Sequence, residues 1–501
     1  MGEIARAPAV NDHLPTSLQH PLAVLGIAVE LLALLLVFVV LFQRKEPSST
    51  AAWILALVFL PGAGALLFLL FGRERIRIPL RGKVDADRAL AASNPPRSGR
   101  APALAEVDDG LPGDAPAVLR DLFHVSSALG RAAPSHGNHV DLLVDGAATY
   151  AALGEAIERA EHHVFAEYYL VRHDRTAAWF RDLLVRAARR GVRVKLLLDG
   201  YGSFWISRRW LRPLREAGAE VVFFLPARLL PFQPMNLRNH RKIVVVDGRV
   251  AFTGGINIGD EYRGEGAPWR DAHLRIEGPA VLPLLLVFAQ DWRFAARAHV
   301  PGPEIERAHA APTFPGRATV AIIRSGPDIA GPEGETIHRV LFSAITSARE
   351  SVFITTPYFI PDRSIIVALQ TAAYRGVDVR ILFPSKSNHP FVFQAGRSFY
   401  EELLDAGVAI FEYGPGMIHA KTMVVDGSVA LVGSANMDLR SFRLNFEVHT
   451  VMDDEVVAAR LSRCFHDDLA VSKRIDPATF RARPLVWKGV EAAARLLSPL
   501  M

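Results

Sequence analysis

One motif occurs twice in this chain of 501 residues, and its duplication constrains the possible folds more than any other feature. The first copy runs from residue 240 to residue 257 and reads HRKIVVVDGRVAFTGGIN. The second runs from residue 419 to residue 436 and reads HAKTMVVDGSVALVGSAN. His, Lys, Asp, Gly and Asn hold the same relative positions in both copies. These matches favour two copies of one functional unit over two unrelated β-hairpins that carry surface His and Lys side chains.

The duplication extends beyond the motif. Three further pairs of segments match in the same order along the chain, namely 164–170 with 352–360, 187–199 with 372–384, and 215–224 with 404–413. Strand-like and helix-like stretches alternate in each half, which is typical of α/β folds. The sequence therefore predicts two homologous α/β domains, residues 117–300 and 317–480, with a Pro-rich connector at 301–316. If the domains pack with pseudo-twofold symmetry, both motifs meet in one site without a dimer.

Each motif leads into a β-branched stretch, and residues two apart on a strand point to the same face. His240 therefore shares a face with Lys242, and His419 shares one with Lys421. Two imidazoles and two ammonium groups suit a phosphodiester substrate. One His can attack phosphorus while the other protonates the departing oxygen, and the lysines offset the developing charge.

The remaining motif positions complete the predicted site. Asp247 and Asp426 fall in Val-Asp-Gly turns, where an Asp side chain bonds nearby backbone, and we count them with the catalytic set. The next strand ends at Gly-Gly or Gly-Ser, where the backbone can approach a ligand closely. Asn257, Asn436 and Ser434 are therefore predicted to bind the substrate.

Two acidic residues follow the motifs at similar distances, Asp271 in WRDAH and Glu447 in NFEVH. Either carboxylate could orient a histidine through its second ring nitrogen. The alternative is an ion pair with a nearby arginine, which would be Arg270, Arg275 or Arg443. The sequence leaves both possibilities open.

Composition narrows the partners and cofactors. The net charge of +5 and the pI of 9.4 favour an anionic partner, such as a lipid surface or nucleic acid. A single cysteine, Cys464, excludes an intrachain disulfide. The chain has no Cys cluster, HExxH motif, EF-hand-like loop or Walker-type loop, so we predict no metal and no cofactor.

The duplicated His-x-Lys-x4-Asp pattern resembles the phospholipase D superfamily. The flanking strings are closer still to membrane-anchored bacterial cardiolipin synthases, and they include SSTAAWILALVFLPGAGALLFLLFGR, FTGGINIGDEY, TPYFIPD and GSANMDLRSFRLNFE. The resemblance covers the chain from about residue 20 onward, except near 85–115. It implies phosphatidyl transfer between two phosphatidylglycerol molecules, which gives cardiolipin and glycerol. It also implies a phosphohistidine intermediate, with His240 as the nucleophile.

Two apolar runs, at 21–42 and 51–72, follow an N-terminal tail of residues 1–20. Each is long enough to cross a bilayer as a helix, although Glu30 is costly within the first. The first run lacks the basic start of a cleaved signal peptide, and the second follows at once. The sequence therefore predicts a hairpin of two transmembrane helices.

Flanking charges predict the orientation. The cations after the second run are Arg73, Arg75, Arg77, Arg81 and Lys83. The positive-inside rule therefore places the duplicated part, and with it the N-terminus, on the cytoplasmic side of a bacterial inner membrane. Residues 73–116 are predicted to form a basic, Pro- and Ala-rich linker.

Two other segments are candidates for contact with anionic lipid. Aromatic and basic residues alternate at 204–238, which suits either a bilayer interface or an amphipathic core helix with a strand. The C-terminal segment, residues 481–501, contains a second candidate interfacial helix.

Several alternatives share parts of this pattern. A hydrolytic phospholipase D, or a phosphatidyltransferase with another acceptor alcohol, would form the same intermediate. A nuclease of the superfamily also cleaves an anionic phosphodiester, but the apolar runs argue against nucleic acid as the partner. A non-catalytic lipid-binding scaffold would not need both histidines. Phosphatidylglycerol and anionic membrane lipids are therefore the expected partners, and the oligomeric state stays open.

Overall fold

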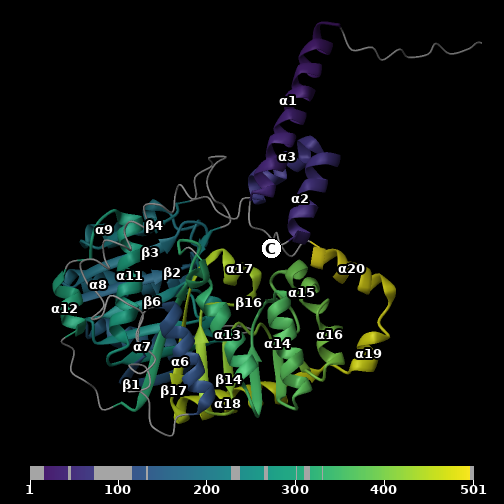
Figure 1. The fold of residues 1–501 in the computed structure, drawn as a ribbon. Helices are drawn as coiled ribbons and strands as arrows, with labels where there is room; N and C mark the ends of the chain where they lie inside the picture. Colours follow the sequence, from purple (N-terminus) through teal and green to yellow (C-terminus); the bar gives the residue numbers. More distant parts are fainter. Residues whose placement is uncertain are drawn as a thin grey trace, which may run out of the picture. The chain divides into compact units, whose positions relative to one another are not determined.

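The computed structural model describes residues 16–42, 47–72, 116–130, 134–226, 237–264, 269–300, 302–309, 316–329 and 331–496. The chain forms two compact units, Met1–Ile76 and Arg77–Met501 (Figure 1). The first is helical, and the second contains the duplicated α/β part. The predicted tail up to residue 15 and the predicted linker from 73 to 115 lie outside the described residues.

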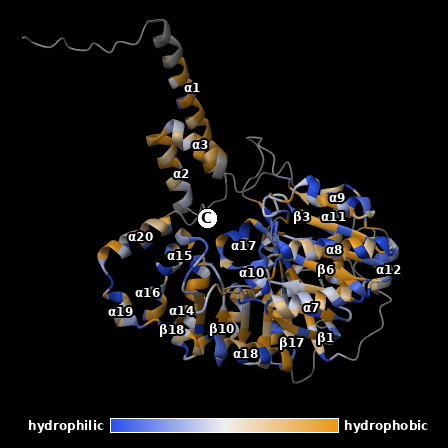
Figure 2. Ribbon diagram, turned by 180° about the vertical axis from the view of Figure 1, so that it is seen from behind, coloured by the Kyte–Doolittle hydropathy of each residue, from blue (hydrophilic) through white to orange (hydrophobic). Residues whose placement is uncertain are grey.

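The helical unit contains α1 (Thr16–Leu41), α2 (Pro47–Phe59) and α3 (Pro61–Phe71). Within the described residues, one helix is long and apolar enough to cross a membrane; it covers Ala23–Leu41 and has a mean hydropathy of 3.0. The second predicted span, at 51–72, is not one continuous helix, because α2 and α3 divide it at Leu60. In Figure 2, the orange of hydrophobic residues covers much of all three helices.

Pro61 explains this division. Proline has no backbone N–H, and its ring clashes with the preceding turn of a continuous helix. Leu60 leaves the helical conformation, with φ −133° and ψ 62°. Gly64 lets the two helices pack closely, since a Cβ at that position would lie 2.3 Å from the carbonyl oxygen of Ala56. The unit has a small core formed by Ala33, Leu36, Val40, Leu57, Ala65 and Phe68.

A 16-stranded sheet runs through the described part of the large unit. Its first-half strands are β1 (Ser135–Val144), β2 (His163–Tyr168), β3 (Arg193–Asp199), β4 (Glu220–Phe224), β5 (Arg238–Asn239), β6 (Lys242–Val246), β7 (Val250–Gly254) and β8 (Ala272–Glu277). Its second-half strands are β9 (Ala318–Ser325), β10 (Ser351–Thr355), β12 (Asp378–Pro384), β13 (Ala409–Tyr413), β14 (Thr422–Val425), β15 (Val429–Gly433), β17 (Asn445–Asp453) and β18 (Ser472–Arg474). A separate small sheet pairs β11 (Phe359–Ile360) with β16 (Met437–Asp438).

The order of the strands is symmetric about the junction of the two halves. It runs β4-β3-β2-β6-β7-β8-β1 in the first half and continues as β9-β17-β15-β14-β10-β12-β13-β18 in the second. Apart from β18, the second series repeats the first in reverse. The halves join where β1 pairs with β9, at Ser135↔Val320 and Asn138↔Ala318. The motif hairpins β6–β7 and β14–β15 therefore hold equivalent positions on either side of the junction.

Helices cover both faces of the sheet (Figure 1). The first half contains α7 (Asp145–Glu158), α8 (Arg175–Arg189), α9 (Arg208–Glu216), α10 (Asp260–Arg263) and α11 (Val281–Ala296). The second half contains α13 (Thr336–Ser347), α14 (Arg363–Tyr374), α15 (Pro390–Arg397), α16 (Tyr400–Asp405), α17 (Leu439–Arg443), α18 (Glu455–Ala470), α19 (Pro477–Arg481) and α20 (Leu485–Leu496). Several begin at an Asp or Ser cap; the Asp174 side chain, for example, accepts a hydrogen bond from Ala177 N.

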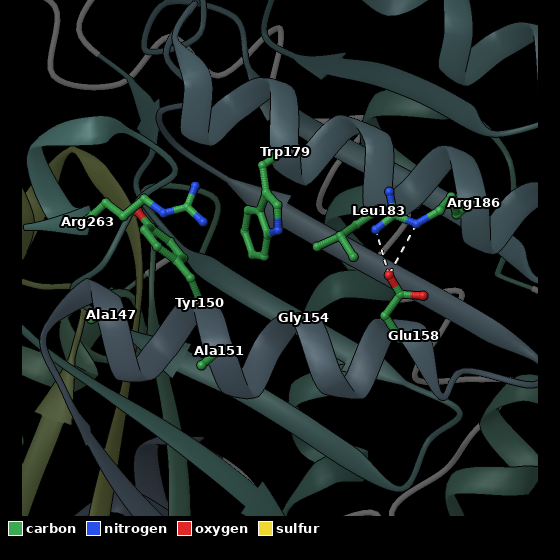
Figure 3. A pocket seen from close by; sticks show the side chains of 9 residues that line it. All are labelled: Ala147, Tyr150, Ala151, Gly154, Glu158, Trp179, Leu183, Arg186 and Arg263. Carbon is green, nitrogen blue, oxygen red and sulfur yellow. Dashed lines mark hydrogen bonds and ion pairs between the residues drawn. The ribbon is translucent and has the colours of Figure 1, made fainter. Parts of the chain in front are cut away.

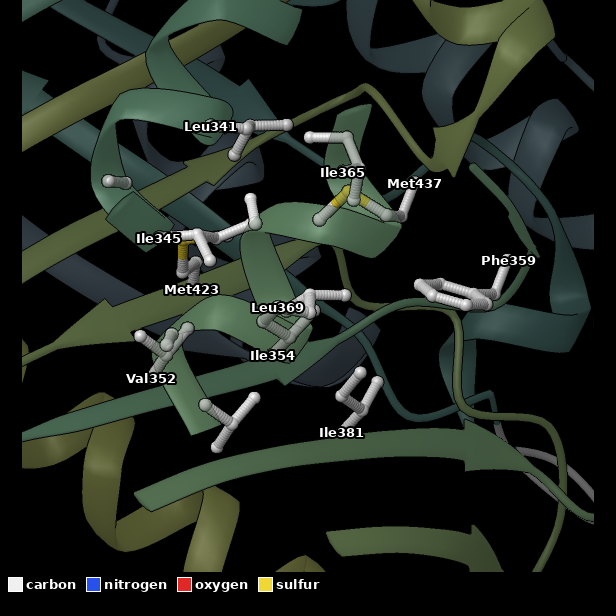
Figure 4. Packing of buried hydrophobic residues seen from close by; sticks show 14 of the residues in the cluster. Leu341, Ile345, Val352, Ile354, Phe359, Ile365, Leu369, Ile381, Met423 and Met437 are labelled. Atoms are coloured by element: carbon white, nitrogen blue, oxygen red, sulfur yellow. The ribbon is translucent and has the colours of Figure 1, made fainter. Parts of the chain in front are cut away.

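Both faces of the central strands are buried. Their sequences are therefore continuous apolar runs and do not alternate between apolar and polar residues. Successive residues of β2 enter opposite cores. Phe165 stacks on Phe288 of α11, whereas Val164 and Ala166 pack in the core that contains residues of α7 and α8. Figure 4 shows the equivalent packing in the second half, around Ile354.

The domain boundaries differ from the prediction at two places. The helix α6 (Ala117–Gly130) begins the predicted first domain, but its buried residues Leu119 and Leu122 pack in the core of the second half, together with Leu341 of α13. Part of the predicted connector forms a helix, α12 (Gly302–His309), whose Ile305 enters the core shared by β6 and α11. The amphipathic pattern of each segment marks a helix, but only tertiary packing decides which core the helix joins.

Candidate active site

The two motif histidines lie where the two halves of the sheet exchange backbone contacts. His240 follows β5, which pairs in parallel with β17 of the other half, and its N–H donates to Phe446 O at 2.9 Å. In the equivalent arrangement, His419 N donates to Arg270 O at 2.7 Å. Each histidine backbone is therefore held by the segment of the other half that carries an acidic candidate.

Each of the two acidic candidates contacts the histidine of the other half. Nδ1 of His240 lies 3.0 Å from both carboxylate oxygens of Glu447, and Nδ1 of His419 lies 2.7 Å from Oδ2 of Asp271. Asp271 and Glu447 are fully buried. Of the arginines weighed as alternative partners, Arg270 instead pairs with Asp145 and Asp468.

The two lysines lie beside the histidines, and both are buried. Lys242 Nζ donates to the carbonyl oxygen of His240 at 2.5 Å. Lys421 Nζ donates to the carbonyl oxygen of His419 and lies 2.9 Å and 3.0 Å from its two ring nitrogens. Lys242 begins β6 and Lys421 directly precedes β14, whereas both histidines lie just before these strands.

Burial dominates the titration of these groups. It lowers the pKa of Lys242 to about 7 and that of Lys421 to about 8, although Glu447 and Asp271 oppose the shift. Burial also lowers the pKa of His240 to about 4 and that of His419 to about 3. At neutral pH, both imidazoles of the free enzyme are therefore neutral.

The electrostatics also connect the two halves of the site. Lys421 contributes to lowering the pKa of His240, and Lys242 contributes to lowering that of His419. Burial alone would raise the pKa of Glu447, but His240 and Lys242 outweigh it, and that pKa falls to about 2. The pKa of Asp271 is likewise lowered, because Lys421 and His419 outweigh the effect of its burial. Both motifs thus contribute to one electrostatic site.

The motif aspartates have a structural position instead of the predicted catalytic one. Asp247 accepts backbone N–H bonds from Glu161, His162 and His163, and Asp426 accepts them from Arg349, Glu350 and Ser351. Both have positive φ, 54° and 48°, which Asp tolerates in tight turns. Each lies at the other end of its strand from the histidine, about 16 Å beyond the lysine at the usual rise of a strand.

Gly255 and Ser434 lie against the two carboxylates, although the sequence predicted that the backbone at the Gly pair approaches a ligand and that Ser434 binds it. A Cβ on Gly255 would lie 2.1 Å from Oδ1 of Asp271. At the equivalent position, Ser434 donates to Oε2 of Glu447 at 2.5 Å and is fully buried. Gly255 leaves room for Asp271, and the hydroxyl of Ser434 binds Glu447.

The two predicted substrate asparagines differ in their surroundings. Asn257 donates to the hydroxyl of Tyr262 at 2.9 Å, and its Oδ1 accepts from Leu170 N at 3.3 Å. Asn436 is buried, and its Oδ1 has no hydrogen-bond partner within the described residues. An amide oxygen without a partner is compatible with a polar ligand at Asn436, whereas Asn257 already holds Tyr262.

Aromatic rings form the walls beside the histidines. Tyr169 meets the ring of His240 edge-on, with 4.9 Å between centroids, while Tyr168 packs into the core against Phe180. Tyr262 and Trp269 contact His419 at 5.7 Å and 5.1 Å. No signal in the sequence marked Tyr262, in the FTGGINIGDEY string, or Trp269, in WRDAH, as a neighbour of His419.

A buried polar cluster beneath the first histidine was also missed. Arg241 is fully buried, pairs with Asp291 and donates through Nε to the carbonyl oxygen of Glu447 at 3.2 Å. Asn239 donates to Glu167, whose pKa burial raises well above its usual value. This cluster fixes the backbone on both sides of His240.

A cavity of about 450 Å³ lies between α7 and α8, next to the first half of the site (Figure 3). Tyr150, Trp179 and Arg263 are among its lining residues. The hydroxyl of Tyr150 donates to Asn257 O at 2.7 Å. The cavity therefore borders the residues that support the site, and none of the motif histidines or lysines lines it. In the described part of the chain, no group of three or more His, Cys, Asp or Glu side chains could hold a metal ion.

Comparisons with known proteins agree with this architecture. The family described as cardiolipin synthase, PLD-like domain, matches residues 153–265 and 341–469, and the phospholipase D-nuclease N-terminal family matches residues 31–73. A phosphatidylserine synthase structure from Haemophilus influenzae aligns with a TM-score of 0.56 and 15% identity, covering 72% of this chain and 95% of that one. At that identity, the alignment shows a shared fold alone.

The symmetric α/β fold and the paired motifs define a two-domain protein of the phospholipase D superfamily. A cardiolipin synthase from a Geobacillus species is 38% identical over 488 residues, 95% of this chain and 94% of that protein. The cardiolipin synthase of Alkalihalophilus pseudofirmus is 38% identical over 473 residues, 92% of this chain and 91% of its own. The chain belongs to the cardiolipin synthase family. It is an enzyme, a phosphatidyltransferase of this superfamily.

Proposed function

We propose that this enzyme transfers the phosphatidyl group of one phosphatidylglycerol to a second, through a phosphohistidine on His240. The observation that carries the proposal is the crossed pairing of both histidines with carboxylates in one two-domain site. Because Nδ1 of His240 faces Glu447, Nε2 is left to attack phosphorus. The new N–P bond replaces the P–O bond to glycerol, and His419 gives a proton to the departing oxygen.

The second half of the reaction reverses these roles. His419, now neutral, takes the proton from a hydroxyl of the acceptor lipid, and that oxygen attacks phosphorus as the N–P bond breaks. The lysines hold the phosphate oxygens through charge-assisted hydrogen bonds. A bound phosphodiester is anionic, so it stabilises the imidazolium form of His419 and offsets the burial that lowers the pKa of this group.

The direct test is the product distribution. Purified enzyme given phosphatidylglycerol alone is expected to form cardiolipin and free glycerol, with phosphatidic acid as a minor product, measured by lipid chromatography. Exhaustive chelation should leave the rate unchanged, because the lysines supply the positive charge. Dominant phosphatidic acid would identify a hydrolase. Product that forms only after another alcohol is added would assign a different acceptor.

The buried lysines predict a basic limit to activity. Both ammonium groups are charged below their lowered pKa values of about 7 and about 8 and neutral above them. We therefore expect kcat/KM to fall as the pH rises through this range. The limit in kcat should lie at higher pH, because bound phosphate stabilises the ammonium forms. Rates in vesicles of constant composition test this, and a flat profile in kcat/KM contradicts the proposed role of the lysines.

We also propose that α1 anchors the enzyme in the membrane with the large unit on the cytoplasmic side. The support is the apolar length of α1 and the run of cations from Arg73 to Lys83. Membrane confinement brings the site close to its lipid acceptor, which favours transfer over hydrolysis.

The C-terminal helix α20 supports operation at a lipid surface, because it buries an acidic side chain against the protein and exposes apolar side chains. Its side chain most buried against the protein is acidic: Glu491 is 2% exposed and pairs with Arg397 and Arg483. Its exposed residues include Leu485, Val486, Trp487, Val490 and Leu496, together with the basic Arg495. Such a helix suits the boundary between headgroups and acyl chains, with Trp487 as an interfacial anchor. In the 204–238 stretch, Phe204 and Trp205 are also exposed, whereas Trp210 is buried in the core.

The position of α20 can be measured with an environment-sensitive dye. In a Cys464→Ser background, Val486→Cys carrying the dye should show blue-shifted emission in anionic proteoliposomes and quenching by brominated lipid. Val456→Cys is the matched control, since Val456 is 77% exposed against 73% for Val486 and lies on α18, at the lower edge of the large unit in Figure 1, away from α20. Identical emission and quenching at the two positions contradict an interfacial α20.

A further inference from the structure

The two helices that follow α1 in the helical unit, α2 and α3, are each too short to cross a bilayer. α1 has 26 residues, α2 has 13 and α3 has 11. At 1.5 Å per residue, these lengths correspond to about 39, 20 and 17 Å, against a hydrocarbon core of about 30 Å. α1 can span the core alone, whereas α2 and α3 each reach only part of the way.

α2 and α3 form an antiparallel hairpin. Trp53, near the start of α2, contacts Phe68, near the end of α3, with 5.3 Å between ring centroids. Closer to the bend, Gly64 packs against the backbone of Ala56. Both pairs are centred on the bend at Leu60 and Pro61, so the chain leaves the hairpin on the side where it entered.

The tip of the hairpin reaches the middle of α1. A Cβ on Gly62 would lie 3.7 Å from Val29 Cγ1. Val29 precedes the end of α1 at Leu41 by 12 residues, which is a rise of about 18 Å. The core of the unit, which includes Ala33, Leu36 and Val40, lies along this C-terminal half of α1. The hairpin therefore extends to about the middle of a bilayer that α1 crosses.

Features of the tip suit a nonpolar environment. Leu60 N donates to Ala56 O at 3.0 Å, Gly64 N donates to Leu60 O at 2.5 Å, and proline has no N–H to leave unpaired. Glu30 follows Val29, so the one acidic residue of α1 lies at the level where α3 begins. The positive end of a helix dipole favours an acidic group there.

We infer that α2 and α3 form a re-entrant hairpin that enters and leaves the bilayer at one face, so that α1 alone crosses it. The charge distribution agrees. Arg44 and Lys45 precede α2, and the cations from Arg73 to Lys83 follow α3. A re-entrant hairpin puts both basic segments on the same face, whereas two spanning helices would put Arg44 and Lys45 on the opposite face, against the positive-inside rule.

Cysteine labelling tests this topology. The inference rests on the proposal that α1 crosses the membrane. It adds the path that the chain takes through α2 and α3. Three variants of the full chain are made in a Cys464→Ser background: Ser17→Cys at the start of α1, Ser49→Cys in α2, and Val456→Cys on the large unit. Cells are treated with a membrane-impermeant maleimide before and after permeabilisation, and cardiolipin formation is assayed in the same cells.

The expected result is that positions 49 and 456 share one side and position 17 lies on the other. If positions 17 and 456 share a side and position 49 lies opposite, α2 and α3 cross as one span, and the inference is overturned. If all three positions lie on one side, α1 does not cross, which overturns both the inference and the proposed anchor. Loss of cardiolipin formation with the expected labelling would instead count against the proposed reaction.

Discussion

Replacing either His240 or His419 with alanine is expected to lower cardiolipin formation by about 10⁴-fold or more, because residues that act as a unit in a covalent mechanism fail together. The double variant should be little worse than either single variant. Initial rates of glycerol release from phosphatidylglycerol measure the effect. His389→Ala is the matched control, since His389 lies in the loop before α15 and outside the motifs, and it should retain activity.

The two histidines should also differ in the covalent intermediate. Rapid quenching followed by peptide mapping should locate the phosphatidyl group on His240. A stable adduct on His419 would exchange the two roles while keeping the shared site. Full activity in either single alanine variant would falsify the shared-site mechanism.

Replacing the orienting carboxylates is expected to lower the rate by about 10²–10⁴-fold, and the crossing determines which step each replacement slows. Glu447 holds His240, so Glu447→Gln should slow the attack on phosphorus. Asp271 holds His419, so Asp271→Asn should slow protonation of the departing alcohol. Both isosteric changes remove the charge that stabilises an imidazolium while keeping the shape of the side chain.

A donor with a good leaving group separates these effects. In phosphatidyl-p-nitrophenol the leaving group departs without a proton, so the burst of nitrophenol from Asp271→Asn and His419→Ala should recover towards the wild-type rate. The burst from Glu447→Gln should stay slow. Recovery in Glu447→Gln and none in Asp271→Asn would mean that each carboxylate serves the histidine of its own half. Circular dichroism of all variants controls for folding, because both carboxylates are fully buried.

Local patterns in the sequence predicted much of the fold and the centre of the site. Matched segments in the same order predicted the two α/β halves, which the symmetric strand order reflects. The two-residue spacing of His240 and Lys242 predicted a shared face, because side chains alternate along a strand. The apolar length of residues 51–72 predicted one span, whereas the structure bends the chain between two short helices at Leu60 and Pro61.

The sequence by itself predicted the two histidines and two lysines of the site, and it left the role of the two carboxylates open. Only the tertiary structure decided the partners: Glu447 is 207 residues from His240, and Asp271 is 148 residues from His419. The tertiary structure also shows that Asp247 and Asp426 bind backbone N–H groups and that Ser434 binds Glu447. The physical reason is that periodicity along a strand fixes which side chains share a face. Which carboxylate meets which histidine depends on how the two halves of the sheet pack together, at the β5–β17 pairing and the bridge between Arg270 and Ile418.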